Sequence, residues 1–239
     1  MAKLEGRLVD RRTIAEGTWA FRIAVKPKLG YRAGQTVDLT LPKPAFNDDA
    51  GNQRTFSIAC APDDTILIAT RVRGSAFKKS LAEGPTDQPI EVEGPFGSFT
   101  LPNRPQRVVL LAGGIGITPF RAMAEDAINR RLEHHITIVH SNRTPEETPF
   151  LEELRSWAVA NDRFVYMPTM TQMEHSKASW SGEHRRVGPE LLATVAPADR
   201  NAALYYVAGP DRFVKGVADS LKTFGVDEDQ IRAEEFPGY

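Results

Sequence analysis

The N-terminal part of the chain alternates short apolar runs with turn residues, a pattern typical of antiparallel β structure. β-branched and aromatic residues recur in runs up to about residue 100, and Gly, Pro, Asn and Asp separate these runs. We predict strands over 4–10, 18–25, 36–41, 53–58, 65–73 and 90–93. Strands at such close intervals are typical of a small antiparallel barrel or sandwich.

A different pattern begins after Thr100. The segment 101–105 contains two prolines and indicates a connection between domains. Beyond it, apolar strands alternate with amphipathic helices, which predicts a parallel sheet covered by helices on both faces. We predict strands over 107–112, 136–140, 163–167, 203–208 and 230–236, helices over 119–132, 148–160, 189–195 and 211–224, and a long loop over 170–187. The predicted fold class is therefore two domains, an antiparallel β-barrel over residues 1–103 and an α/β domain with a parallel five-stranded sheet over residues 104–239.

A glycine-rich turn follows the first strand of the second domain. Apolar residues 108–111 are typical of a strand buried on both faces, and a cluster of small and capping residues comes next: Gly113, Gly114, Gly116, Thr118 and Pro119. Glycine lets a ligand approach the backbone closely, and we expect Thr118 to cap the following helix, with Arg121 on its polar face. A helix N-terminus behind glycines binds anions, so we predict a phosphate site. The alternative is an ordinary βα turn, and the departure from G-x-G-x-x-G leaves the ligand open.

Composition and charge exclude several classes of function. The 239 residues carry a formal net charge of −1, which argues against a broad surface for nucleic acid or membrane. No apolar run reaches the roughly 18 residues of a membrane span, and no signal core precedes the first strand, so we expect a cytoplasmic protein. Cys60 is the only cysteine, which excludes an intramolecular disulfide and a four-cysteine iron–sulfur cluster. No histidine pair has metal-ligand spacing, and we predict no metal site.

Two stretches of the first domain are candidates for binding phosphate. Arg54 begins the segment Arg-Thr-Phe-Ser, and an arginine can neutralise a phosphate with two parallel hydrogen bonds. An ordinary strand with alternating side chains is the alternative for this segment. Arg71 and Arg73 precede the turn Gly74-Ser75-Ala76, where we expect Ser75 to cap a short helix. A solvated basic turn is the alternative here.

The second domain offers further candidates where its strands end. Asn142 and Arg143 follow the second strand of the predicted sheet. An arginine at this point suits the 2′-phosphate of NADP and favours NADPH slightly over NADH, with an exposed loop arginine as the alternative. Gly209 and Pro210 end another strand, so we expect them on the same rim as the glycine-rich turn.

Taken together and in this order, these motifs resemble the ferredoxin–NADP+ reductase family of flavoproteins, over nearly the whole chain. The segments that carry the resemblance are Ala33-Gly34-Gln35, Arg54-x-Phe56-Ser57, Gly74-Ser75, Gly94-Pro95-Phe96-Gly97, Gly113-Gly114-x-Gly116-x-Thr118-Pro119 and Ala208-Gly209-Pro210. The resemblance implies a FAD-binding antiparallel barrel followed by an NAD(P)-binding α/β domain. Phe56 stands in place of the family's usual tyrosine, and Ala208 in place of a cysteine that many members have.

The same resemblance implies roles for individual residues. Arg54 and the backbone N–H groups of residues 74–76 would contact the FAD diphosphate, Phe56 would pack on the isoalloxazine, and Ser57 would lie near its N5. Residues 114 and 118 would bound the nicotinamide nucleotide, 142 and 143 its adenosine end, and 209 its diphosphate. The predicted cofactor-binding residues are Arg54, Thr55, Phe56, Ser57, Arg71, Arg73, Gly74, Ser75, Ala76, Gly113, Gly114, Gly116, Thr118, Pro119, Asn142, Arg143, Gly209, Pro210 and Tyr239. The predicted catalytic residues are Ser57 at N5, Glu235 for proton handling and Tyr239 as a cover of the flavin.

The resemblance implies a flavoprotein reductase that transfers a hydride between NAD(P)H and bound FAD and passes electrons to a separate acceptor, such as a ferredoxin, a flavodoxin or an oxygenase component. A single cysteine cannot ligate a plant-type [2Fe-2S] cluster, so we expect a discrete redox partner. Two alternatives stay open. One is a free flavin reductase, in which flavin is a substrate; the other is a non-catalytic regulatory subunit that binds flavin or nucleotide.

Overall fold

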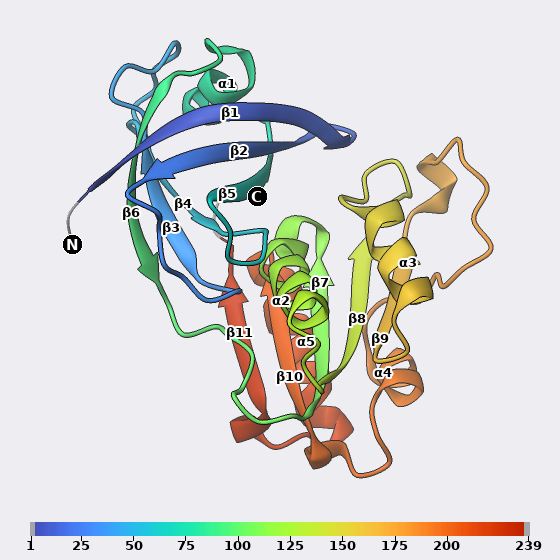
Figure 1. Ribbon diagram of the computed structural model, residues 1–239. Helices are drawn as coiled ribbons and strands as arrows, with labels where there is room; N and C mark the ends of the chain where they lie inside the picture. The colour runs from blue at the N-terminus through green and yellow to red at the C-terminus, as the bar shows by residue number, and fades with distance from the viewer. Residues whose placement is uncertain (1–2, 237–239) are drawn as a thin grey trace.

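The computed structural model describes residues 3–236, in which two sheets are joined by a connection over 97–106 (Figure 1). The predicted domain boundary after residue 103 falls in this connection and stays a prediction. The elements of the first sheet are β1 Leu4–Ala15, β2 Thr18–Lys26, β3 Thr36–Thr40, β4 Gln53–Ser57, β5 Thr65–Arg71 and β6 Pro89–Phe96, with helix α1 Ala76–Glu83 after β5.

The first sheet is antiparallel, as predicted, and its strand order is β4-β3-β6-β1-β2-β5. β1 is longer than expected because its pairing with β2 continues, through two irregularities of register, to the turn at Gly17, whose φ is +64°. β4 and β5 form the two edges of the sheet. The N–H of Ala59 donates to the carbonyl of Leu67 at 2.7 Å, but within residues 3–236 no ladder joins these edges. The sheet is therefore a barrel that is not closed.

The second sheet is parallel and has the order β11-β10-β7-β8-β9, which confirms the predicted fold class. Its strands are β7 Arg107–Gly113, β8 His135–Asn142, β9 Phe164–Met170, β10 Ala203–Gly209 and β11 Ile231–Glu235, and its helices are α2 Ile117–Asn129, α3 Leu151–Ala160, α4 Pro189–Val195 and α5 Asp211–Phe224. None of the helices in the described part of the chain combines the length and hydropathy needed to cross a membrane.

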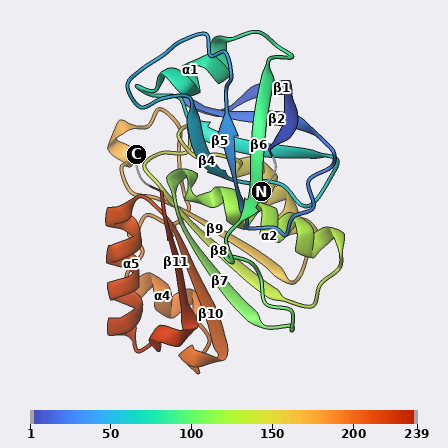
Figure 2. The ribbon, with the colours of Figure 1, turned by 90° about the vertical axis from the view of Figure 1, so that its left-hand side faces the viewer.

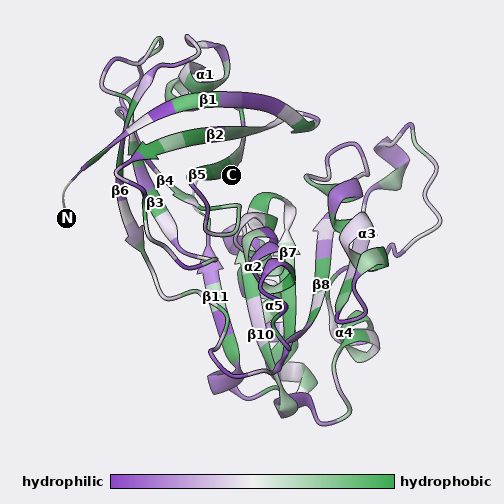
Figure 3. Cartoon of the chain, in the orientation of Figure 1, coloured by the Kyte–Doolittle hydropathy of each residue, from purple (hydrophilic) through white to green (hydrophobic). Residues whose placement is uncertain are grey.

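Helices cover both faces of the parallel sheet (Figure 2). Val108 and Leu110 of β7 belong to an apolar cluster that includes α2, α3 and the interior of the barrel, whereas Val109 and Leu111 pack with α4 and α5. This is why β7 reads as a continuous apolar run, which Figure 3 shows in green at the centre of the sheet. The barrel and one face of the parallel sheet thus share a single hydrophobic core.

The connections from β7 and β10 leave the sheet at neighbouring strand ends. β7 leads into α2 and β10 into α5, which lie on opposite faces of the sheet. In open α/β sheets such a switch point leaves a crevice at the carboxyl ends of the strands, where ligands bind. The glycine-rich turn after β7 lies at this crevice, on the side that faces the barrel (Figure 1).

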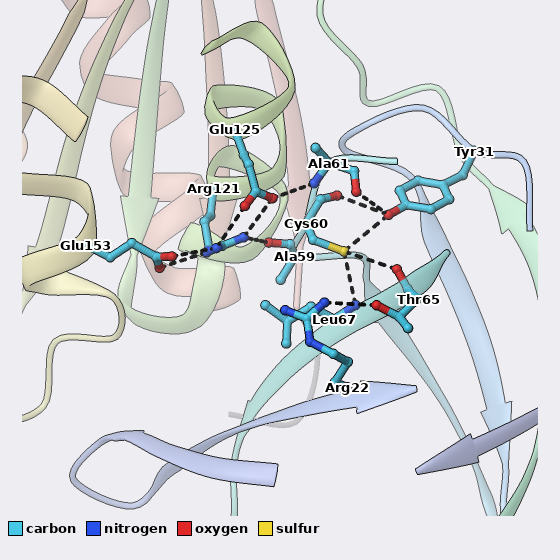
Figure 4. Close-up of polar contacts among 10 residues, drawn as sticks. All are labelled: Arg22, Tyr31, Ala59, Cys60, Ala61, Thr65, Leu67, Arg121, Glu125 and Glu153. Atoms are coloured by element: carbon cyan, nitrogen blue, oxygen red, sulfur yellow. Dashed lines mark hydrogen bonds and ion pairs between the residues drawn. The ribbon is translucent and has the colours of Figure 1, made fainter. Parts of the chain in front are cut away.

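A buried arginine on α2 joins the two domains (Figure 4). Arg121 lies on the polar face of the helix, as predicted, but this face packs against the barrel and the side chain is only 3% exposed. Its Nε and Nη2 donate to the carboxylate of Glu153 on α3 at 2.9 and 2.7 Å, and its Nη1 donates to the carbonyl of Ala59. The rings of Phe150 and Trp157 each lie with their centroid 5.1 Å from the guanidinium carbon.

Glu125, one turn further along α2, completes this interdomain clamp. Its carboxylate accepts hydrogen bonds from Arg121 at 3.1 and 3.2 Å and one from the backbone N–H of Ala61 at 2.7 Å. On the barrel side, the hydroxyl of Tyr31 donates to the carbonyl of Ala61 at 2.7 Å. The loop that connects β4 to β5 is therefore held from both domains.

We expect Arg121→Met to lower the free energy of unfolding by about 3 kcal/mol, because Glu125 and Glu153 would lose their cation at a buried interface. Arg130→Met is the matched control. Arg130 lies at the C-terminal end of α2 and pairs with Asp126 at 3.1 Å, but its side chain is 64% exposed, so we expect a loss below about 1 kcal/mol. Urea unfolding followed by circular dichroism measures both variants. Equal losses would contradict the clamp.

Candidate functional site

Two cavities lie between the barrel and the carboxyl ends of the parallel strands. The first, the barrel cavity, has a volume of about 440 Å³, and its lining includes Arg54, Thr55, Phe56, Ser57, Gly74, Ser75, Thr118 and Glu235. The second, the strand-end cavity, has a volume of about 450 Å³, and its lining includes Arg71, Gly113, Gly114, Asn142, Arg143 and Pro210. Arg73 and Lys78 line both cavities. The structure therefore gathers most of the predicted site residues around two adjoining spaces.

Some predicted site residues do not line either cavity. The residues that belong to neither lining are Ala76, Gly116, Pro119 and Gly209. Tyr239, predicted to cover a flavin, lies outside the described residues. The aromatic side chain that does line the barrel cavity near the end of β11 is Phe236, which the sequence analysis did not select.

The loop before β4 holds Arg54 in place. The Nη1 of Arg54 donates to the carbonyls of Ala50 and Gly51 at 2.9 and 3.0 Å, and its guanidinium carbon lies 5.6 Å from the ring centroid of Phe77. The opposite edge of the guanidinium faces Asp48, with Nη2 3.6 Å from Oδ1. Arg54 is therefore oriented before any ligand binds, which lowers the entropy cost of binding an anion.

Asp48 also binds the N-terminus of α1. Its Oδ2 accepts the backbone N–H of Ala76 at 2.7 Å, and Ser75 caps the helix by accepting the N–H of Lys78, as predicted. Helix N-termini attract negative charge, so the chain itself supplies one carboxylate at the predicted diphosphate cradle. The sequence analysis missed Asp48, because only the fold brings the loop before β4 to this helix.

Each cavity contains buried polar atoms without a hydrogen-bond partner in the described part of the chain. These atoms are Oγ of Ser57 and Oε2 of Glu234 in the barrel cavity, and both amide atoms of Asn142 in the strand-end cavity. Burial raises the pKa of Glu234 to about 7. An unpaired buried polar group costs free energy, so these atoms fit a ligand that offers them hydrogen bonds.

The sequence predicted a role for Glu235 instead of Glu234, although the alternation of side chains between the two faces of a strand could have distinguished them. Successive residues of a strand point to opposite faces, so Glu234 and Glu235 lie on opposite faces of β11. Both glutamates line the barrel cavity, but Glu235 is exposed, whereas Glu234 is half-buried. The carboxyl with an unusual environment is therefore Glu234.

Glycine is present at three positions of the turn after β7 for different structural reasons. A Cβ on Gly113 would lie 2.6 Å from the ring of Phe213, and one on Gly116 would lie 2.2 Å from the carbonyl of Ala208. These two glycines let the turn pack on α5 and β10. Gly114 differs, because its φ is +55° and the atom nearest to an added Cβ is 3.9 Å away. Gly113 and Gly114 both line the strand-end cavity, and of these two glycines Gly114 is the one with open space beside its Cα.

Thr118 does not cap α2, so this prediction was wrong. A short 3₁₀ turn over Gly114–Gly116 runs directly into the helix, which places the cap position at Gly116. The hydroxyl of Thr118 instead donates to the carbonyl of Ile115 at 3.1 Å. Thr118 is 2% exposed and lines the barrel cavity.

The strand-end cavity is positively charged. Its lining includes Arg71, Arg73, Lys78 and Arg143 and, within residues 3–236, no Asp or Glu. Arg71 pairs with Glu147, which stands outside the lining, at 3.2 Å. Clustered cations in a concave site attract anions, so the cavity suits a ligand with several phosphates.

Comparisons with known proteins agree on the type of molecule. Residues 110–219 match the oxidoreductase NAD-binding domain family. The chain is 31% identical over 215 residues to ferredoxin–NADP reductase B of Sorangium cellulosum, covering 86% of this chain and 85% of that protein. It is 28% identical over 217 residues to the ferredoxin reductase component of 3-ketosteroid-9-alpha-monooxygenase of Rhodococcus rhodochrous, covering 89% of this chain and 58% of that longer protein.

A solved structure shows the same fold. The ferredoxin NADP+ reductase of Neisseria gonorrhoeae with bound FAD and NADP superposes with a TM-score of 0.81 and 22% sequence identity, covering 98% of this chain and 99% of that one. The agreement extends over both sheets, because almost the whole of each chain is included.

We expect Gly116→Ala to lower the free energy of unfolding by about 3 kcal/mol, because the added methyl group would force the turn away from β10. Gly216→Ala is the matched control. Gly216 is exposed on α5 and nothing lies within 4 Å of an added Cβ, so we expect a gain of about 0.5–1 kcal/mol from helix propensity. Thermal and urea unfolding measure both. An unchanged free energy of unfolding in Gly116→Ala would show that the turn can move to make room for the methyl group.

Proposed function

Because the chain belongs to the ferredoxin–NADP reductase family of FAD-dependent NAD(P)H oxidoreductases, we propose that it takes electrons from NADPH into FAD in the barrel cavity and delivers them to a separate redox protein. The observation that carries this proposal is the pair of adjoining cavities, one with an arginine and a helix N-terminus and the other with a cluster of cations. When bound, FAD accepts two electrons from NAD(P)H and releases them singly or in pairs.

The barrel cavity fits FAD. Arg54 and the backbone of Gly74 and Ser75 would hold its diphosphate, and Phe56 and Phe236 line the same cavity and would pack against the ring system. Ser57 offers a hydroxyl whose oxygen has no hydrogen-bond partner among residues 3–236. We propose that this hydroxyl hydrogen-bonds N5 of the flavin, the atom at which the predicted reduction takes place.

Glu234 is the residue that we propose for proton handling, in place of the exposed Glu235. Its pKa of about 7, raised by burial, means that a proton resides on this carboxyl in a large share of molecules near neutral pH. A protonated carboxyl donates a hydrogen bond and adds no negative charge to the cavity. A group with a pKa near the working pH is also well matched to proton transfer.

The strand-end cavity supports the preference for NADPH. Arg143 follows β8, the strand next to the glycine-rich turn, where an arginine suits the 2′-phosphate of NADP. Asn142 is 5% exposed and its amide has no partner among the described residues, so it would bind the adenosine end. Arg71, Arg73 and Lys78 would balance the charge of the diphosphate.

The electron acceptor that we propose is a ferredoxin, a flavodoxin or an oxygenase component. The similarity to a ferredoxin–NADP reductase and to the reductase component of a monooxygenase supports this class of partner. A second candidate function is a free flavin reductase, and Asp48 favours it. The Asp48 carboxylate occupies an N–H of the diphosphate cradle and would repel a diphosphate, which would help flavin to exchange.

We expect the purified protein to bind FAD. We also expect NADPH to reduce this FAD under anaerobic conditions at least tenfold more efficiently than NADH does. Stopped-flow absorbance at the flavin band measures both reactions. Retention of flavin through gel filtration separates a bound cofactor from an exchanging substrate. A colourless protein that takes up no FAD would contradict the proposed reductase.

Arg143→Gln tests the origin of this preference. We expect it to reduce the ratio of kcat/KM for NADPH over NADH by roughly tenfold, because a charged hydrogen bond to the 2′-phosphate is lost. Arg163→Gln is the control, since Arg163 is exposed just before β9, at the amino ends of the parallel strands, whereas Arg143 lies at their carboxyl ends.

We expect the rate of flavin reduction to fall as the pH rises through about 7, and Glu234→Gln to remove this dependence. Glu234 holds its proton below its pKa of about 7 and is a carboxylate above it. A carboxylate would repel the negative charge that reduction brings into the cavity. Stopped-flow rates between pH 5.5 and 8.5, at roughly half-unit steps, measure the profile. The same inflection in the variant would exclude Glu234 as the titrating group.

A further inference from the structure

A chain of hydrogen bonds runs from β9 across β8 to the glycine-rich turn. The hydroxyl of Tyr166 on β9 lies 2.9 Å from Nδ1 of His140 on β8, and Nε2 of His140 lies 2.8 Å from the carbonyl oxygen of Gly114. His140 is 0% exposed. Because a carbonyl can only accept, Nε2 of His140 carries the proton, and Tyr166 donates to Nδ1.

His140 is neutral in this arrangement. Burial, assisted by the nearby guanidinium of Arg71, lowers the pKa of His140 to about 4. The hydrogen bond from Tyr166 occupies Nδ1 and so selects the one tautomer that can donate to Gly114. The two preceding positions of the strand, Ile138 and Val139, are apolar and buried, and a buried polar side chain costs free energy unless its hydrogen bonds are made.

The bond from His140 reaches the position of the turn that is open to the strand-end cavity. Gly114 has a φ of +55°, and its carbonyl accepts two hydrogen bonds, one from Nε2 of His140 and one from the backbone N–H of Ile117 within the 3₁₀ turn. The C=O and N–H of a trans peptide point in opposite directions. A carbonyl directed at His140 therefore directs the N–H of Ile115 away from it, and Gly114 and Ile115 both line the strand-end cavity.

We propose that His140, held in one tautomer by Tyr166, is a positioning residue that presents the N–H of Ile115 to a phosphate of the nicotinamide nucleotide. His140 does not contact the nucleotide itself; it acts through the Gly114–Ile115 peptide. This inference rests on the proposed function of the strand-end cavity. It predicts that His140 controls nucleotide affinity and leaves flavin affinity unchanged, since the barrel cavity does not include this peptide.

The test compares the affinity for NADP+ with the affinity for FAD in three variants of the flavin-loaded protein. We expect His140→Leu to weaken NADP+ binding at least tenfold and to leave FAD affinity unchanged. His140→Gln should stay within about threefold of the native protein, because the glutamine amide can place a donor where Nε2 lies. Tyr166→Phe should weaken NADP+ binding about threefold, because the tautomer is no longer selected. Difference absorbance of the flavin reports NADP+ binding, and fluorescence quenching reports FAD binding.

Tyr205→Phe is the matched control for Tyr166→Phe. Tyr205 is a buried tyrosine of the same sheet, but its hydroxyl donates at 2.9 Å to the carbonyl of Arg200, before the start of β10. We expect this variant to bind NADP+ like the native protein.

Three results would overturn the inference: unchanged NADP+ affinity in His140→Leu, a loss in His140→Gln as large as in His140→Leu, or a parallel loss of FAD affinity. If His140→Leu fails to fold, the NADP+ affinities of His140→Gln and Tyr166→Phe, compared with that of Tyr205→Phe, still test the inference. Failure of the native protein to bind NADP+ would count against the proposed function instead.

Discussion

The buried guanidinium of Arg121 sets the relation between the two domains on which both cavities depend. It makes five hydrogen bonds, to Glu125, Glu153 and the carbonyl of Ala59. The planar guanidinium can satisfy so many acceptors at once, and a charge buried without them would be costly. The loop it holds leads from β4, which carries Arg54 and Ser57, to β5, which ends at Arg71. The position of this loop on α2 therefore sets the distance between the barrel residues and the glycine-rich turn.

Neither of the two cavities is formed by one domain alone. The cations of the strand-end cavity include Arg71, Arg73 and Lys78 from the barrel domain, whereas the turn that they face belongs to the parallel sheet. The barrel cavity in turn is lined by Thr118 and Glu234 from the second domain. Because each domain supplies part of both linings, two ligands bound there would lie side by side, as direct transfer between a nucleotide and a flavin requires.

Charged and neutral groups are divided between these sites in a consistent way. Cations line the strand-end cavity, where phosphates are expected, while burial holds His140 neutral and raises the pKa of Glu234 to about 7. A neutral histidine donates one directed hydrogen bond and adds no positive charge beside Arg71. A carboxyl with a pKa near 7 carries less negative charge beside a flavin at neutral pH than an ordinary glutamate does. Burial thus shifts both groups toward their neutral forms.

The elements and their order were determined by the sequence alone. The predicted helices over 189–195 and 211–224 coincide with α4 and α5, and the change of periodicity after residue 100 correctly separated an antiparallel from a parallel sheet. These features are local, because side-chain periodicity follows the geometry of a single element. The glycine-rich turn was found for the same reason, since its signal lies within one strand–turn–helix unit.

Only the tertiary structure decided which polar residues meet. It showed that the polar face of α2 packs on the barrel through Arg121, that Asp48 reaches the N-terminus of α1, and that Gly114 is the open glycine of its turn. It also distinguished Glu234 from Glu235 and connected His140 to the turn. Each of these contacts joins residues far apart in the chain or depends on the burial that such contacts create. Periodicity reports which side of an element is apolar, but the partner of a buried polar group is determined by how separate elements pack.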